Sequence, residues 1–157
     1  MSTLRAAFVA ASIIWMILLL AAPFVASRAH ASTLGTLFVV SVYGVGSLVC
    51  HQLTERSYRL WAAQMPVCAR CAGIYFGAAM SAICMAVYRT TNVAQCFSLA
   101  KTARLALTLA VTPTALTLLY EWTTGQMPAH AIRALAGVPI GAVAAWLVVT
   151  VADNQVN

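Results

Sequence analysis

Long apolar runs without a single charged residue constrain this chain more than any other feature of its sequence. Residues 6–26 form the first of these runs and reach the roughly 20 residues that a helix needs to cross a bilayer. The chain is 62% hydrophobic and only 8% charged, whereas a soluble domain carries roughly 25% charged residues. Such a chain cannot cover a surface that faces water, so lipid must be the solvent for most of it.

Four further apolar stretches follow, and two of them contain a proline. Pro113 and Pro139 would each kink a helix, but neighbouring helices accommodate such residues in a membrane. No stretch alternates with the period of a barrel strand, which leaves helices to span the bilayer. We therefore expect an all-α fold, an integral membrane helical bundle of four to five transmembrane helices, as a multi-pass protein of the cytoplasmic (inner) membrane. The four stretches are 33–50, 71–88, 105–120 and 134–151.

The chain contains no linker, internal repeat or low-complexity tract, so we expect a single membrane domain over residues 1–157. Residues 33–151 form its motif-bearing core, and residues 6–26 form an extra N-terminal transmembrane helix. Arg5 and the A-x-A triplet at 29–31 give this first helix some resemblance to a cleaved signal peptide. Its apolar core is longer than the roughly 7–15 residues typical of a signal, which favours a retained helix.

The formal net charge of +6 comes from basic residues that are scattered over the ends of the apolar runs. This distribution is typical of transmembrane helices, and no basic run exists that could follow the phosphates of a nucleic acid. We therefore expect the lipid bilayer as a partner, and no nucleic acid. If five helices cross the bilayer, the loops 51–70 and 121–133 lie on one face, together with the N-terminus.

The polar stretch between the second and third apolar runs is unlike the rest of the chain. Residues 49–77 hold three of the five cysteines, one histidine and several arginines. Cys68 and Cys71 form a C-x-x-C where Pro66 predicts the start of a helix, and a helix N-terminus favours thiolate over thiol. Arg70, between the two cysteines, acts in the same direction.

Thiolates and imidazole are the ligands of structural zinc sites, and C-x-x-C is a common half of such sites. We expect Cys50, His51, Cys68 and Cys71 to bind a transition metal, zinc foremost, at one membrane face. Since Cys50 and His51 are adjacent, both can bind only if the helix ends at Cys50, and His130 is an alternative nitrogen ligand. The charged residues expected to support the site are Arg56, Arg70, Glu121 and Arg133.

Two other functions fit the same residues. A C-x-x-C at a helix N-terminus, with a third cysteine nearby, suits a membrane thiol–disulfide oxidoreductase that could pass electrons to a quinone. The chain could also be a non-catalytic assembly or interaction subunit with a membrane-protein partner. The cysteines could, finally, be small hydrophobic residues at helix contacts. The residues leave these alternatives open, including whether the protein is an enzyme.

Two pairs of glycines lie near the starts of the third and fifth apolar runs. Small residues four positions apart make a flat stripe along which two helices approach closely. We therefore expect these two helices to pack together, which would bring Arg133 near the C-x-x-C. The pairs are Gly73 with Gly77 and Gly137 with Gly141.

The motif resembles the signature of a family of small prokaryotic membrane proteins, the domain of unknown function 2085. That signature reads Cys-His-Gln, then an acid followed by Arg-Ser-aromatic, then Pro-Val-Cys-x-Arg-Cys-x-Gly-Ile-Tyr-x-Gly. Its first part matches here from Cys50 to Gly77, and a looser second half matches from Pro113 to Gly141. The resemblance implies a small helical membrane protein and no particular activity. Family members often carry an Asp in the fourth apolar run, where Glu121 is the nearest acid in this chain.

Overall fold

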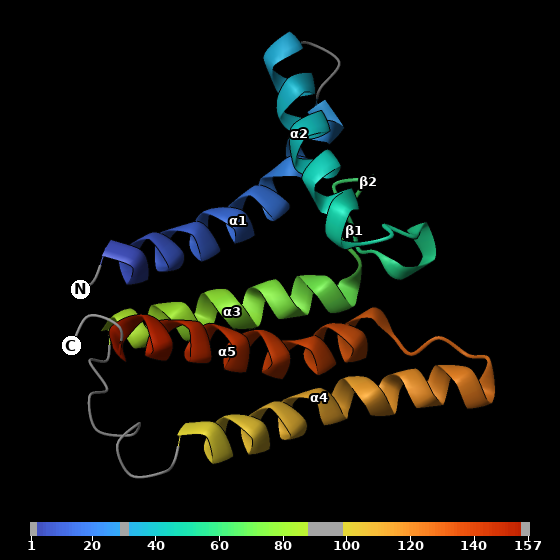
Figure 1. The fold of residues 1–157 in the computed structure, drawn as a ribbon. Helices are drawn as coiled ribbons and strands as arrows, with labels where there is room; N and C mark the ends of the chain where they lie inside the picture. Colours follow the sequence, from blue (N-terminus) through green and yellow to red (C-terminus); the bar gives the residue numbers. More distant parts are fainter. Residues whose placement is uncertain (1–2, 29–31, 88–98, 155–157) are drawn as a thin grey trace.

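The computed structural model describes residues 3–28, 32–87 and 99–154, and nearly all of this part is helical (Figure 1). It confirms the all-α class. Among the described residues, four helices are long and apolar enough to cross a membrane, namely α1, α3, α4 and α5. The elements in chain order are α1 (Thr3–Arg28), α2 (Thr33–Val49), the 3-10 turn η2 (Thr54–Arg56), β1 (Arg59–Leu60), β2 (Ala63–Gln64), α3 (Ala69–Val87), α4 (Leu99–Thr124) and α5 (His130–Asn154).

Helices α3 and α5 lie side by side at backbone contact (Figure 1). A side-chain carbon added at any of four glycines would overlap a carbonyl oxygen of the opposite helix. Only residues without a side chain allow two helices to approach this closely. The packing therefore sets the common direction of α3 and α5. The facing pairs are Gly73 with Ala134, Gly77 with Val138, Gly137 with Arg70 and Gly141 with Ile74.

Helix α1 packs against α3 and belongs to the same core as the motif. Leu19 and Ala22 are fully buried, and the ring of Trp15 meets the ring of Tyr75 edge-on, with 5.9 Å between the centroids. The core cluster that contains these α1 residues extends into α2, the segment before α3, and α3 itself. Its members from those parts are Val42, Met65, Val67 and Ala72.

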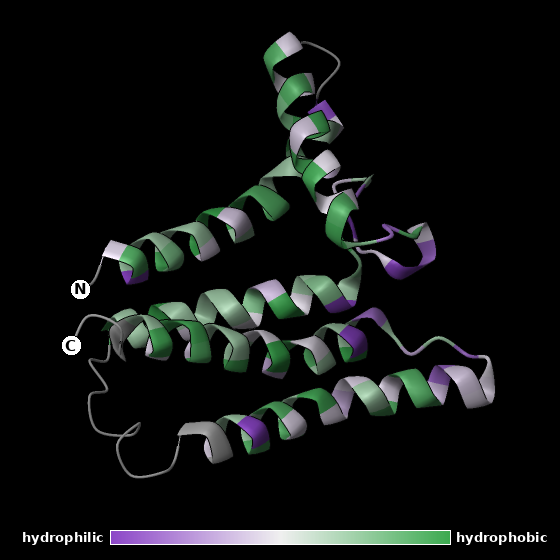
Figure 2. Cartoon of the chain, viewed as in Figure 1, coloured by the Kyte–Doolittle hydropathy of each residue, from purple (hydrophilic) through white to green (hydrophobic). Residues whose placement is uncertain are grey.

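Helix α4 packs against α5 and exposes most of its surface. Thr114 donates a hydrogen bond of 2.8 Å from its hydroxyl to the carbonyl of Ala136. Most of the outward side chains of α4 are apolar, Leu109 and Leu116 among them. Figure 2 shows that the other helices also consist mainly of hydrophobic residues, with hydrophilic residues gathered mainly at helix ends and in the segment between α2 and α3. Lipid is the solvent that fits these apolar surfaces.

The expectation that the N-terminus lies on the same membrane face as the motif is wrong. The side chain of Arg5 donates to the carbonyl of Met85, near the end of α3, whereas the motif precedes the start of α3. The N-terminus and the motif therefore lie at opposite ends of the bundle. The reason is that α2 runs across the direction of α3, α4 and α5 instead of along it (Figure 1).

Candidate metal or thiol site

The end of α2 is tied to the residues that precede α3. Helix α2 stops at Val49, and Cys50 is extended, with φ −147° and ψ 136°. The side-chain amide of Gln52 then donates to the carbonyls of Tyr43 (2.8 Å) and Pro66 (2.7 Å). Gln64 donates in turn to the backbone carbonyl of Gln52, at 2.6 Å. Two glutamines thus hold the two sides of the loop together.

A short hairpin turns the chain back toward α3. Strand β1 pairs antiparallel with β2, and Leu60 lies opposite Ala63. The two residues between them, Trp61 and Ala62, both have positive φ, at 50° and 65°, the conformation of the tight two-residue hairpin turns. Non-glycine residues adopt it at a cost of roughly 1–2 kcal/mol each. The hairpin exposes Trp61 and delivers the chain to the start of α3.

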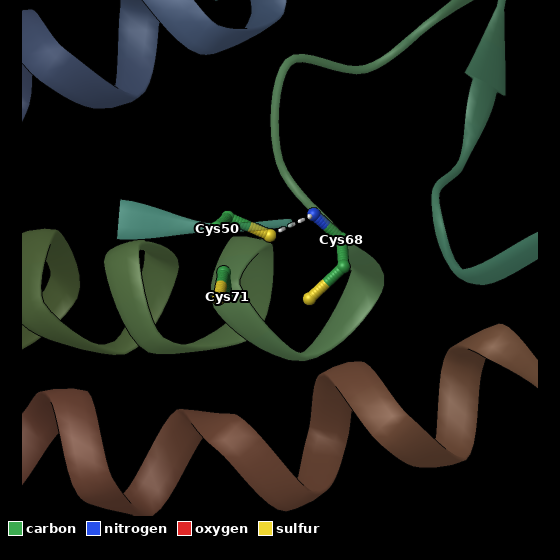
Figure 3. Close-up of side chains that lie close together, drawn as sticks. All are labelled: Cys50, Cys68 and Cys71. Atoms are coloured by element: carbon green, nitrogen blue, oxygen red, sulfur yellow. Dashed lines mark hydrogen bonds between the residues drawn. The ribbon is translucent and has the colours of Figure 1, made fainter. Parts of the chain in front are cut away.

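Three thiols meet where these segments converge (Figure 3). The sulfur atoms of Cys50, Cys68 and Cys71 all lie within 4.8 Å of one another, and each residue is half-buried. The backbone N–H of Cys68 donates to the sulfur of Cys50 at 3.2 Å. The three are free thiols. The site therefore takes one sulfur from the end of α2 and two from the start of α3.

Hydrogen bonds from its neighbours favour the thiolate form of Cys68. The thiol of Cys71 is the largest cause, and the backbone N–H groups of Cys71 and Arg70 and the thiol of Cys50 add to it. Burial opposes them, but together they lower the pKa of Cys68 to about 5. Cys68 precedes the first turn of α3, where the helix N-terminus also favours negative charge. A thiolate is both a metal ligand and a nucleophile.

The predicted histidine ligands lie outside this group of sulfurs. Among the described residues, the group that could hold a metal contains the three cysteines alone. His51 is exposed, because successive side chains of an extended segment point to opposite sides and Cys50 points inward. His130 packs its ring on that of Tyr58, with 5.5 Å between the centroids, and its Nε2 atom is buried without a hydrogen-bond partner.

A cluster of buried charges joins α3, α4 and α5 near the thiols. The Nε atom of Arg133 lies 2.9 Å from the carboxylate of Glu121, and Arg70 lies 3.6 Å from the same oxygen. Arg70 also donates to the hydroxyl of Thr117, at 3.2 Å. Two guanidiniums thus share one carboxylate. The described ion pairs include Arg70 and Arg133 but not Arg56, which is half-buried in the loop.

Two residues that position the thiols were given no role by the sequence reasoning. A side-chain carbon at Gly46 would overlap the carbonyl oxygen of Pro66 and lie 2.9 Å from the amide nitrogen of Gln52. In the sequence, Gln52 stands out only as part of the Cys-His-Gln triplet. Its place directly after Cys50 and His51 is the one signal for this role, since an amide can bridge two backbone carbonyls.

The helices and the site together define a small helical membrane protein with a group of thiols at one end of its bundle. The chain belongs to the family described as "Predicted membrane protein (DUF2085)", whose model matches residues 50–147 and so includes all three thiols. It is also 41% identical over 56 residues to "Uncharacterized protein MJ1492" from Methanocaldococcus jannaschii. That match covers 36% of each chain. No solved structure matches the chain.

Proposed function

We propose that Cys50, Cys68 and Cys71 bind a transition metal, zinc foremost, at one face of the cytoplasmic membrane. The observation that carries this proposal is the approach of three sulfur atoms to within 4.8 Å of one another. Thiolates are soft ligands that suit zinc and Cu(I). The metal would serve either to hold the loop in place or to be handled by the protein.

The proposed site has three protein ligands, because His51 and His130 lie outside the group. Zinc sites with three protein ligands keep a fourth position for water or another ligand, whereas closed structural sites have four. We therefore infer a site in which one coordination position of the metal stays open to an incoming ligand.

The charges around the thiols favour this proposal. Three thiolates and Zn²⁺ leave a net charge of about −1 by simple counting, and an unpaired charge is costly at a membrane. Arg70 and Arg133 together carry one positive charge more than Glu121, the carboxylate that they share. This excess offsets the charge of the proposed metal site.

Elemental analysis of the detergent-purified protein, without a histidine tag, tests the proposal. We expect near-stoichiometric metal in the native chain and in a Cys84→Ser control, because Cys84 is exposed on α3 and outside the sulfur group. The double variant Cys68→Ser/Cys71→Ser should lose the metal. Metal-free native protein with intact folding, or a double variant that keeps its metal, would contradict the proposal.

Thiol–disulfide exchange is a second candidate, favoured by the hydrogen bonding between Cys68 and Cys71. In this reaction the two thiols would form one disulfide and pass two electrons and two protons to an oxidant, either a second disulfide or a quinone. Mass spectrometry of the rapidly alkylated protein distinguishes the two candidates. A Cys68–Cys71 disulfide that forms in the reduced protein when a quinone is added, with the quinone reduced to quinol, would support exchange, whereas thiols that stay reduced would oppose it.

A further inference from the structure

Helix α2 has no charged residue and is mainly apolar, yet few of its side chains pack against the rest of the described chain. Leu34 is 78% exposed and Leu48 is 84% exposed, while the buried residues of the helix are Val42 and Gly46. At 100° per residue, its exposed positions cover more than half of the circumference. A partner helix would cover a narrower stripe, so an occupant that wraps around α2 fits better.

Both serine hydroxyls of α2 are bonded to carbonyls of its own backbone. Ser41 donates to the carbonyl of Leu37 at 2.8 Å, and Ser47 donates to the carbonyl of Gly44 at 2.7 Å. Serine hydroxyls bonded in this way need no water. Since the backbone is also paired within the helix, α2 meets the requirements for burial in lipid.

Contacts place both ends of α2 at the motif end of the bundle. At its start, a side-chain carbon at Gly35 would lie 3.5 Å from the side chain of Val25. The neighbouring Phe24 meets the ring of Trp61, in the hairpin, with 5.4 Å between the centroids. At its other end, α2 delivers Cys50 to Cys68. Helix α1 has thus already reached the motif end before α2 begins, and α2 finishes there.

Aromatic and basic side chains mark this end as the border between lipid and water. Trp61 is 54% exposed in the hairpin, and Trp122 is 81% exposed in the last turn of α4. Exposed tryptophans gather at the level of the lipid headgroups. Arg28 ends α1, with its guanidinium 4.4 Å from the centroid of the Phe24 ring, the same ring that meets Trp61. An arginine at this level can reach the headgroups.

We propose that α2 lies in the plane of the membrane, in the acyl layer just beneath the headgroups at the motif end, with lipid covering its exposed face. Its 17 residues are fewer than the roughly 20 that a crossing helix needs. Surface helices with one charged face lie in the headgroup layer, but α2 has no charged residue and so lies deeper. In this arrangement, Cys50 reaches the other two thiols from the lipid side.

Protease-cleavable tags on the full-length chain test the path of α2. One tag precedes Thr3, a second is inserted after Gly125 in the exposed loop between α4 and α5, and a third follows the C-terminus. In sealed vesicles, we expect external protease to cleave the two terminal tags together and the loop tag only in vesicles of opposite orientation. Cleavage of the N-terminal and loop tags from the same side would show that α2 crosses, and would overturn the proposal. Thermal unfolding like that of the untagged chain is the control for folding.

The number of chains per particle tests whether lipid or a second copy covers α2. We expect single chains in nanodiscs, with no change in Leu37→Arg or in the control Leu4→Arg, two positions that are both exposed. A dimer that Leu37→Arg dissociates and Leu4→Arg leaves intact would identify a second copy as the occupant and contradict the lipid assignment. A dimer insensitive to both changes leaves α2 outside the interface and agrees with it.

Discussion

Gly46 decides how closely Cys50 can approach Cys68. Its Cα faces the carbonyl of Pro66, so an added methyl group would push α2 away from the segment before α3. We expect Gly46→Ala to weaken metal binding by about 10- to 100-fold, the range measured for residues that orient metal ligands. Competition with a chelator of known affinity measures the change.

Gly44 provides a matched control in the same helix, because nothing lies within 4 Å of a side-chain carbon at that position. Gly44→Ala should bind metal as the native chain does. Equal affinities of the two variants would show that the approach of α2 to Pro66 does not govern the site.

The thiol of Cys68 should have an unusual pH profile in the metal-free protein. Because its pKa is lowered to about 5, it is a thiolate at neutral pH, and this form is lost only as the pH falls through about 5. We expect its alkylation rate to be constant from pH 9 to about pH 6 and to fall below that, as mass spectrometry of the labelled peptide would show.

The thiol of Cys71 is the largest cause of this lowered pKa, so Cys71→Ala should move the midpoint of the profile to higher pH. An unchanged midpoint would mean that the neighbouring thiol does not stabilise the thiolate.

At the residue scale the sequence predicted which cysteines meet, because C-x-x-C fixes two of them on one helix turn. It could not predict that His51 points away, since that depends on the extended backbone of Cys50.

At the scale of the elements, Glu121 joins three helices through one side chain. Its partner Arg133 is only 3% exposed, so removal of the carboxylate charge would leave a buried guanidinium without an ion pair. Breaking such a pair costs on the order of 3–5 kcal/mol. We expect Glu121→Gln to lower the thermal midpoint of the detergent-solubilised protein substantially.

Glu55 is the matched control, because its side chain is exposed in the turn η2. Glu55→Gln should leave the midpoint within the small range typical of surface changes. A stable Glu121→Gln variant would indicate that Arg133 finds another partner. The sequence predicted that Glu121 and the arginines support one site, because charges at a membrane edge need partners.

The path of α2 could not be read from the sequence in the same way. Its apolar residues indicate that its surroundings are lipid, but they fit a crossing helix and an in-plane helix equally well. The direction is determined by contacts between distant residues, such as Gly35 with Val25 and Gly46 with Pro66. Glycines that make such contacts look in the sequence like any other glycine of a membrane helix.

At the scale of the whole molecule, α1 is part of the core that supports the motif. Leu19 is fully buried in the cluster that also contains residues of α2 and α3. We expect Leu19→Ala to destabilise the protein by on the order of 2 kcal/mol, because the cavity removes packing contacts that lipid cannot replace. Chemical or thermal unfolding in detergent measures the loss.

Leu20 is its natural control, since it is the next residue along α1 and is 41% exposed. Leu20→Ala should change stability far less. Equal effects of the two changes would mean that α1 is an accessory helix, as its position outside the resemblance suggests.

The sequence indicated the presence of α1 from its length and apolarity, but its part in the core depends on Trp15, Leu19 and Ala22, which look like any other apolar residues of a crossing helix.

Because the three sulfur atoms come from two separate segments, a bound metal would cross-link these segments much as a disulfide does. Cys68 and Cys71 stay close in any helical state of α3, but Cys50 is 18 positions away from Cys68. An ion held by all three would close that loop and exclude the many unfolded conformations in which its ends are apart. All three thiolates could bind the ion only after α2 and α3 had come into contact. Complete metal loading would then report that the two helices have assembled in the membrane.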